Sequence, residues 1–146
     1  MKKSELHHII QSGHGVTSVG VAFSVKPVVD ETSIEGIEID LAGYESAEVI
    51  MEFGTWVDGD RTFVIMESDS SGTSFSAVAD ADLLGGANSI SCSSASDDEA
   101  VHCRGYIGDM RYLRVDVSSS ASTGMIVSAL VVRGHRRNKG VLNETA

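Results

Sequence analysis

Three short stretches of this sequence gather carboxylates closely enough to suggest a calcium site. They are Asp58-Gly-Asp60, Glu67-Ser-Asp69 and Asp97-Asp-Glu99. Calcium takes about six to eight oxygen ligands, and none of the three stretches has the spacing of an EF-hand loop. The neighbouring Gly and Ser residues are typical of turns, where Asp side chains accept hydrogen bonds from nearby backbone. Ordinary solvated turn carboxylates are therefore the favoured interpretation, and calcium binding is the alternative.

Histidine and cysteine are the other candidate metal ligands. Three of the five histidines fall within the first 30 residues, where little else predicts a rigid site. His102 and Cys103 are adjacent, and adjacent residues of a strand point to opposite faces, so they cannot easily share one ion. Cys92 and Cys103 could form a disulfide if their strands were neighbours, but two reduced thiols are favoured for a protein made in the cytosol. No metal ion is expected.

Residues for nucleophilic catalysis or phosphate binding do not fall into a known pattern. The many serines cluster in turns, and no G-x-S-x-G sequence places one of them on a strand-to-helix elbow. No glycine-rich loop leads from a strand into a helix, which is the arrangement that cradles phosphates. The chain is therefore expected not to be an enzyme and to carry no cofactor.

The distribution of charge favours binding over catalysis. Between Asp30 and Asp116 there are 19 Asp and Glu against four Arg, whereas the two flanks hold seven Lys and Arg against two Glu. Nucleic acid is not an expected partner, because the acidic middle would be repelled by phosphate. The basic side chains near the C-terminus could instead lie on acidic protein neighbours. The candidate partner-binding residues are Arg133, Arg136, Arg137 and Lys139.

Length and composition limit the class of protein further. With 146 residues, 42% of them hydrophobic and 22% charged, the chain can form one domain with a substantial core. No apolar run approaches the ~18 residues that span a membrane. The two lysines near the N-terminus are not followed by the apolar stretch of a signal peptide. Synthesis in the cytoplasm and no membrane partner are therefore expected.

Alternating apolar residues predict about seven β-strands separated by Gly- and Asp-rich turns. Residues 47–53 alternate, residues 62–67 are apolar on both faces as in a central strand, and residues 75–78 complete a hairpin with them. Only residues 80–85 predict helix, of one or two turns. Strands about ten residues apart predict an all-β fold, an antiparallel β-sandwich of jelly-roll or immunoglobulin-like type. The predicted core contains Val49, Met51, Phe53, Phe63, Ile65, Leu113, Val115, Val127 and Ala129.

The predicted organisation has three parts. Residues 1–30 form an N-terminal arm, residues 31–135 the β-sandwich and residues 136–146 a basic C-terminal tail. The first 30 residues lack clean periodicity, although a short strand could form around residues 20–25. Residues 1 to about 30 and 133–146 are predicted to be mobile in the free protein and ordered on a particle, because little in their sequence would hold them down alone.

The stretch from Leu41 to His135 resembles a family of small virion structural proteins of tailed bacteriophages. The motifs follow one another in matching order and spacing over about two thirds of the chain. They are Leu-Ala-Gly-Tyr-Glu-Ser-Ala (41–47), Trp-Val-Asp-Gly-Asp-Arg-Thr-Phe (56–63), Glu-Ser-Asp-Ser-Ser-Gly-Thr-Ser-Phe-Ser-Ala-Val (67–78), Asp-Ala-Asp-Leu-Leu-Gly (80–85), Gly-Tyr-Ile-Gly-Asp-Met-Arg-Tyr-Leu-Arg-Val (105–115), Thr-Gly (123–124) and Val-Val-Arg-Gly-His-Arg-Arg (131–137). The resemblance implies a structural role in the phage particle.

Capsid decoration is the expected position within the particle. Such a cement protein binds the assembled head in many copies, so its partners would be the major capsid protein and sister subunits. A homo-oligomer is expected, a trimer first, because decoration proteins commonly sit on local three-fold axes. The alternatives are a head–tail connector or tail component and, from another class, a carbohydrate-binding module on the virion surface, with Trp56 as its candidate platform.

Overall fold

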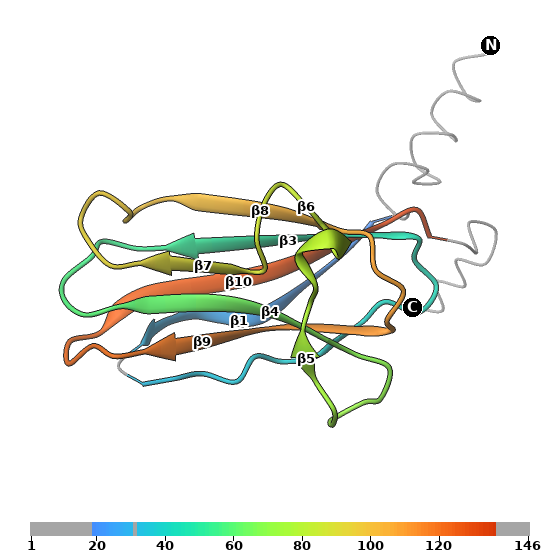
Figure 1. Ribbon diagram of the computed structural model, residues 1–146, viewed down its shortest axis with the longest axis horizontal. Helices are drawn as coiled ribbons and strands as arrows, with labels where there is room; N and C mark the ends of the chain where they lie inside the picture. Colours follow the sequence, from blue (N-terminus) through green and yellow to red (C-terminus); the bar gives the residue numbers. More distant parts are fainter. Residues whose placement is uncertain (1–18, 31, 137–146) are drawn as a thin grey trace, which may run out of the picture.

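The computed structural model describes residues 19–30 and 32–136. These residues form two antiparallel β-sheets packed face to face (Figure 1), which confirms the predicted all-β sandwich. Sheet A has the strand order β1-β10-β3-β8-β6, and sheet B has the order β2-β9-β4-β5 with β7 also paired to β4. The strands are β1 (Gly20–Asp30), β2 (Ile39–Asp40), β3 (Ser46–Phe53), β4 (Arg61–Ser68), β5 (Ser76–Ala77), β6 (Leu83–Leu84), β7 (Ser89–Cys92), β8 (Val101–Tyr106), β9 (Tyr112–Ser119) and β10 (Met125–Gly134).

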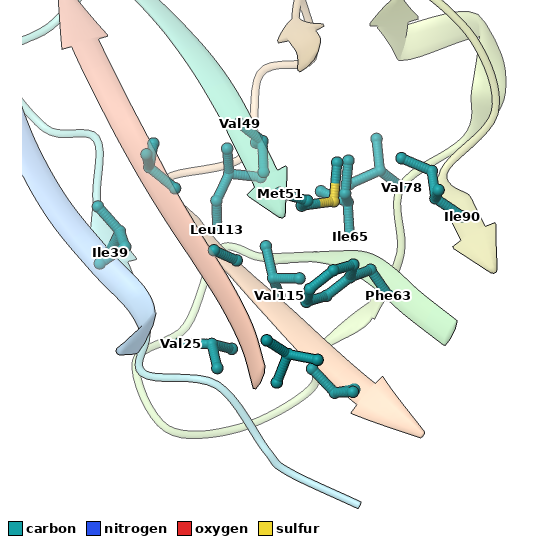
Figure 2. Packing of buried hydrophobic residues seen from close by; sticks show 14 of the residues in the cluster. Val25, Ile39, Val49, Met51, Phe63, Ile65, Val78, Ile90, Leu113 and Val115 are labelled. Carbon is teal, nitrogen blue, oxygen red and sulfur yellow. The ribbon is translucent and has the colours of Figure 1, made fainter. Parts of the chain in front are cut away.

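The core lies between the two sheets because apolar residues alternate along the strands. In β3 every second side chain is buried, whereas Glu48 and Glu52 are exposed on the opposite face. All nine predicted core side chains are at most 1% exposed, and most of them are visible in Figure 2. The rings of Phe53 and Phe63 join the sheets, with their centroids 4.6 Å apart. The predicted core is therefore confirmed.

Strand β4 is central, as its apolar character on both faces predicts. It pairs with β9 along its whole length and with β7 and β5 on its other side. The pairing of Met66 with Ala77 confirms the predicted hairpin between residues 62–67 and 75–78.

The predicted helix at residues 80–85 is only one 3₁₀ turn, η1 (Asp80–Asp82). Asp80 does not cap this turn; its carboxylate accepts the backbone N–H of Asn88 at 2.8 Å. Leu83 and Leu84 form β6 instead of a second turn, because Leu83 is buried in register with Tyr106 of β8. The predicted helix was therefore too long, since pairing with β8 outweighs local helix preference.

Strand β1 extends the sandwich beyond the predicted boundary at residue 31. It pairs with β10 from Gly20 to Asp30, with register shifts on either side of Val25. The Ser24 hydroxyl donates to the Ile37 carbonyl and accepts the Val115 N–H, both at 2.8 Å, which ties β1 to sheet B. Residues 20–30 thus belong to sheet A rather than to an arm. The irregular register breaks the alternation, which explains why only a short strand was expected there.

Cys92 and Cys103 are both free thiols, as the favoured interpretation expected. Cys92 is buried on β7 of sheet B, and Cys103 is exposed on β8 of sheet A. A disulfide between them would have to join different sheets. The predicted mobility of residues 1 to about 30 and 133–146 is wrong for Gly20–Asp30 and for Arg133 and Gly134, which pair within sheet A. Residues 1–18 and 137–146, with the side chains Arg137 and Lys139, lie outside the described part of the chain.

Candidate functional site: interaction surfaces

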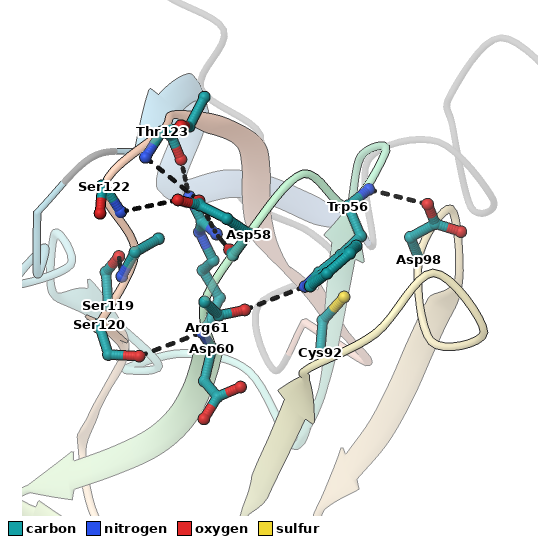
Figure 3. A network of polar contacts seen from close by, with 12 residues as sticks. Trp56, Asp58, Asp60, Arg61, Cys92, Asp98, Ser119, Ser120, Ser122 and Thr123 are labelled. Atoms are coloured by element: carbon teal, nitrogen blue, oxygen red, sulfur yellow. Dashed lines mark hydrogen bonds and ion pairs between the residues drawn. The ribbon is translucent and has the colours of Figure 1, made fainter.

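A buried arginine holds two loops together at one end of the sandwich (Figure 3). The Arg61 side chain is 0% exposed and donates hydrogen bonds to the carbonyls of Asp58 and Thr123. The Asp58 carboxylate accepts the N–H groups of Ser122 and Thr123 at 3.2 and 3.1 Å. These bonds join the β3–β4 loop to the β9–β10 loop. The guanidinium is buried because backbone carbonyls and a carboxylate replace its water.

The other carboxylate-rich loop is fixed in the same way. The Asp98 carboxylate accepts the backbone N–H of Trp56 at 2.8 Å. Asp97 accepts the hydroxyl of Ser94 at 2.9 Å, and hydrogen bonds from Ser94 and Ser93 lower the pKa of Asp97. Within residues 19–30 and 32–136, no three His, Cys, Asp or Glu side chains are grouped so that they could hold a metal ion. These carboxylates organise turns.

Trp56, the candidate carbohydrate platform, is part of the same loop structure. Its indole N–H donates to the Gly59 carbonyl at 2.9 Å, and its ring is partly buried against the core. A sugar-binding platform needs an aromatic face open to solvent and groups beside it that bind hydroxyls. Trp56 instead stabilises the β3–β4 loop, so the geometry does not favour a carbohydrate site here.

The opposite end of the sandwich carries a cleft of about 590 Å³, lined by residues 41–47 and 106–111. Behind it, the Tyr106 hydroxyl donates to the buried Glu67 carboxylate at 2.5 Å and accepts the Met110 N–H at 3.0 Å. Burial and the hydrogen bond to Glu67 raise the pKa of Tyr106 well above its ordinary value. The tyrosine is therefore a neutral hydrogen-bond donor that holds one wall of the cleft, rather than a titrating group.

Arginines beside this cleft are held by the protein itself. Arg111 donates two hydrogen bonds to the Asp40 carboxylate at 3.0 and 2.9 Å, which lowers the pKa of Asp40. Arg133 donates to the Asp40 carbonyl at 2.8 Å and lies 4.8 Å from the centre of the Tyr44 ring. Sequence reasoning missed Arg111 and Asp40, because their 71-residue separation gives no local signal.

The structure describes two of the four predicted partner-binding residues, Arg133 and Arg136. Arg133 lies at the end of β10 with its guanidinium on Tyr44, so its position serves the fold. Arg136 is partly buried just beyond β10, while Arg137 and Lys139 lie outside the described residues. The structure therefore brings Arg133 and Arg136 to the end of the sandwich that carries the cleft.

The outer face of sheet A is a surface that sequence reasoning missed. Directly paired residues of antiparallel strands point to the same face, so the register identifies its members. One row across four strands consists of Phe23, Leu130, Ile50 and Cys103. Val21, Leu84 and Val101 on the same face are 58–60% exposed. This surface, called the apolar face below, comprises Val21, Phe23, Val29, Ile50, Leu84, Val101, Cys103, Ile126, Leu130 and Val132.

The outer face of sheet B has a different character. Arg114 forms an ion pair with Asp116 at 3.0 Å, and the hydroxyls of Thr62 and Ser91 lie 2.7 Å apart. These polar side chains hydrogen-bond to one another along the face that meets water. The outer faces of the two sheets therefore differ: that of sheet B carries polar side chains that suit contact with water, whereas that of sheet A carries a group of apolar side chains, which is typical of a binding surface.

Two carboxylates interrupt the apolar face at its middle strand. Glu48 and Glu52 stand on β3, on either side of Ile50, and both are exposed. The Ser128 hydroxyl lies 3.4 Å from the Glu52 carboxylate. An occupant of this face must therefore supply apolar side chains and complement negative charge.

Comparison with known proteins adds no family: no family model and no curated protein sequence matches this chain. In the part of the chain that the structure describes, no helix is long and apolar enough to cross a membrane.

Proposed function

We propose that this chain is a structural protein of a tailed-bacteriophage particle, and specifically a capsid decoration protein that binds and stabilises the assembled head. The observation that carries the proposal is the apolar face of sheet A on an acidic sandwich. Exposed apolar surfaces of this extent are typical of sites that bind other proteins. The series of motifs between Leu41 and His135 provides the link to virion proteins.

The architecture suits a subunit that must hold neighbouring capsid proteins. The two sheets are joined by a continuous core and by buried polar bonds such as Tyr106–Glu67, so a load applied to one sheet passes to the other. The loops at the Arg61 end are also held by buried hydrogen bonds, from Arg61 to the carbonyls of Asp58 and Thr123. A rigid body keeps its binding surfaces in register, and many weak contacts add up when copies bind one lattice.

A head–tail connector or tail component is the main alternative, because it would use the same kind of surface. The two proposals differ in copy number. A decoration protein covers the shell, whereas a connector or tail-tip protein forms a symmetric ring of few copies. The carbohydrate-binding alternative receives no support from Trp56, whose ring packs on the core.

Quantitative mass spectrometry of purified particles whose genome encodes this chain tests the proposal. If the chain covers the shell, the ratio of this chain to the major capsid protein should be of the order of one. A ratio that corresponds to a single ring would contradict decoration and support the connector or tail alternative. Absence of the chain from purified particles, with presence in infected-cell extract, would overturn the virion proposal altogether.

A further inference from the structure

The apolar face of sheet A is large enough to be a binding surface. The four longer strands of sheet A, about 4.8 Å apart, span about 19 Å, and the eight residues of β3 span about 26 Å. The flat area of this part of the sheet, with Glu48 and Glu52 included, is therefore about 500 Å², within the range of the largest apolar patch on a typical soluble monomer, which is often functional.

A second copy packed face to face through this surface is disfavoured by charge. β3 is the middle strand of sheet A, so a two-fold axis through the centre of the face would bring Glu48 and Glu52 of both copies together. Like charges that meet across an interface are unfavourable, and more so when apolar surroundings exclude water. The suitable occupant carries apolar side chains and positive charge.

The first 18 residues of this chain have that composition. Leu6, Ile9 and Ile10 provide apolar side chains, Lys2 and Lys3 provide positive charge, and Glu5 is the only acidic residue among them. The segment joins the sandwich at Val19, directly before β1, which is an edge strand of sheet A. Eighteen residues reach up to about 60 Å when extended, more than twice the width of the sheet.

The C-terminal residues 137–146 fit less well. They offer Val141 and Leu142 as their large apolar side chains and reach only about 33 Å when extended. They continue from β10, the strand that lies inside sheet A between β1 and β3, rather than from its edge. Length, composition and point of departure therefore all favour the N-terminal segment.

We propose that residues 1–18 dock on the outer face of sheet A. Leu6, Ile9 and Ile10 pack against the row formed by Phe23, Leu130, Ile50 and Cys103, and the lysines lie near Glu48 and Glu52. This docking does not depend on the proposed virion role, because it follows from the face and the segment alone. If the proposed virion role holds, release of the segment would expose the same face to a capsid neighbour.

The two native cysteines provide the test. Cys103 lies on the apolar face, whereas Cys92 is buried in the core, so alkylation of Cys103 reports the cover and alkylation of Cys92 reports unfolding. Rates of alkylation at each thiol, measured by mass spectrometry, are compared between the full chain and a variant that lacks residues 1–18. We expect Cys103 to react about tenfold faster after the deletion, which corresponds to a docking free energy of about 1.4 kcal/mol. The synthetic peptide of residues 1–18 should slow the reaction again.

Point variants of the full chain give a second, independent measurement. The double substitution Leu6→Asp and Ile9→Asp should accelerate Cys103 alkylation as the deletion does. Gln11→Asp with Ser12→Asp adds the same charge at neighbouring polar positions and should have a smaller effect. If alkylation of Cys92 shows that the variant lacking residues 1–18 is unfolded, the point variants of the full chain test the docking instead.

Equal Cys103 rates in the full chain, the deletion and the Leu6/Ile9 variant, with Cys92 unreactive in all of them, would overturn the proposal. Protection of Cys103 that rises with protein concentration and survives the deletion would also overturn it. That second result would identify another copy of the chain as the cover. Protection that is independent of concentration and lost on deletion is the result expected.

Discussion

Tyr106 and Glu67 join the two sheets through one hydrogen bond: the phenol on β8 of sheet A donates to the carboxylate on β4 of sheet B at 2.5 Å. Both side chains are buried, at 6% and 8% exposure. A buried carboxylate that loses its donor retains the full cost of its desolvation. This pair therefore contributes to the rigidity of the sandwich behind the cleft.

Tyr106→Phe should lower the free energy of unfolding by about 1–3 kcal/mol, because Glu67 would stay buried without this donor. Urea unfolding at neutral pH measures the loss. Tyr112→Phe is the matched control, since Tyr112 is half-buried on the outer side of sheet B. Equal stability of the Tyr106 variant and the parent would show that the bond makes no net contribution.

The same bond predicts a dependence of stability on alkaline pH. Burial first, and then the hydrogen bond to Glu67, raise the pKa of Tyr106 in the folded state. The stabilisation is complete below the unfolded-state pKa of about 10 and declines as pH rises above it, because the unfolded chain then releases a proton that the folded chain retains. Chemical unfolding between pH 8 and 11 should show a steeper decline for the parent than for Tyr106→Phe.

Phe63→Ala should cost about 3–5 kcal/mol, because it opens a cavity beside Phe53 at the centre of the core. Such a loss is a large part of the stability of a domain. Thermal melting measures it, with the exposed Ile126→Ala as the control. A melting temperature within a degree or two of the parent would contradict the central position of Phe63.

Arg61→Met should destabilise the sandwich by about 2–4 kcal/mol, because the carbonyls of Asp58 and Thr123 would lose buried donors. Arg61→Lys should restore little, since one ammonium cannot reproduce a planar fork that reaches two loops. Hydrogen exchange should show faster opening of residues 56–60 and 120–124. Unchanged exchange in these loops would contradict the role assigned to Arg61.

The free protein is expected to be a homo-oligomer, and a trimer is the preferred expectation. Edge strands such as β1 expose backbone groups that a neighbouring subunit can cover. Light scattering coupled to size exclusion measures the mass directly. A monomer in solution, and again after release from particles, would contradict this prediction.

Attachment to particles is expected to depend on the chain ends and on salt. Arg136, Arg137 and Lys139 would face carboxylates of the shell or of a sister subunit, each exposed pair contributing about 0–1 kcal/mol. Binding should therefore weaken as salt rises toward about 1 M, where the Debye length is about 3 Å.

Deletion of residues 137–146, or separately of residues 1–18, leaves every described strand intact. Occupancy of each variant on undecorated particles, measured at low and high salt, tests whether the ends contribute to attachment. Unchanged occupancy for both deletions would show that the sandwich alone attaches the protein.

Local sequence determined the strands and the side of each strand that is buried. Alternation in residues 47–53 predicted which side chains of β3 enter the core, because successive side chains of a strand point to opposite faces. Apolar residues on both faces of residues 62–67 predicted a central strand, and β4 is central. The same approach failed at β1, where shifts in register remove the alternation.

Only the tertiary structure decided which strands are neighbours and in what register. Phe23, Ile50, Cys103 and Leu130 come from four distant parts of the sequence and form one row because β1, β10, β3 and β8 pair in that order. Arg61 looks like an ordinary charged residue before a strand until the β9–β10 loop closes over it. Strand pairing is set by the balance of burial over the whole molecule, and that balance is not contained in any single segment.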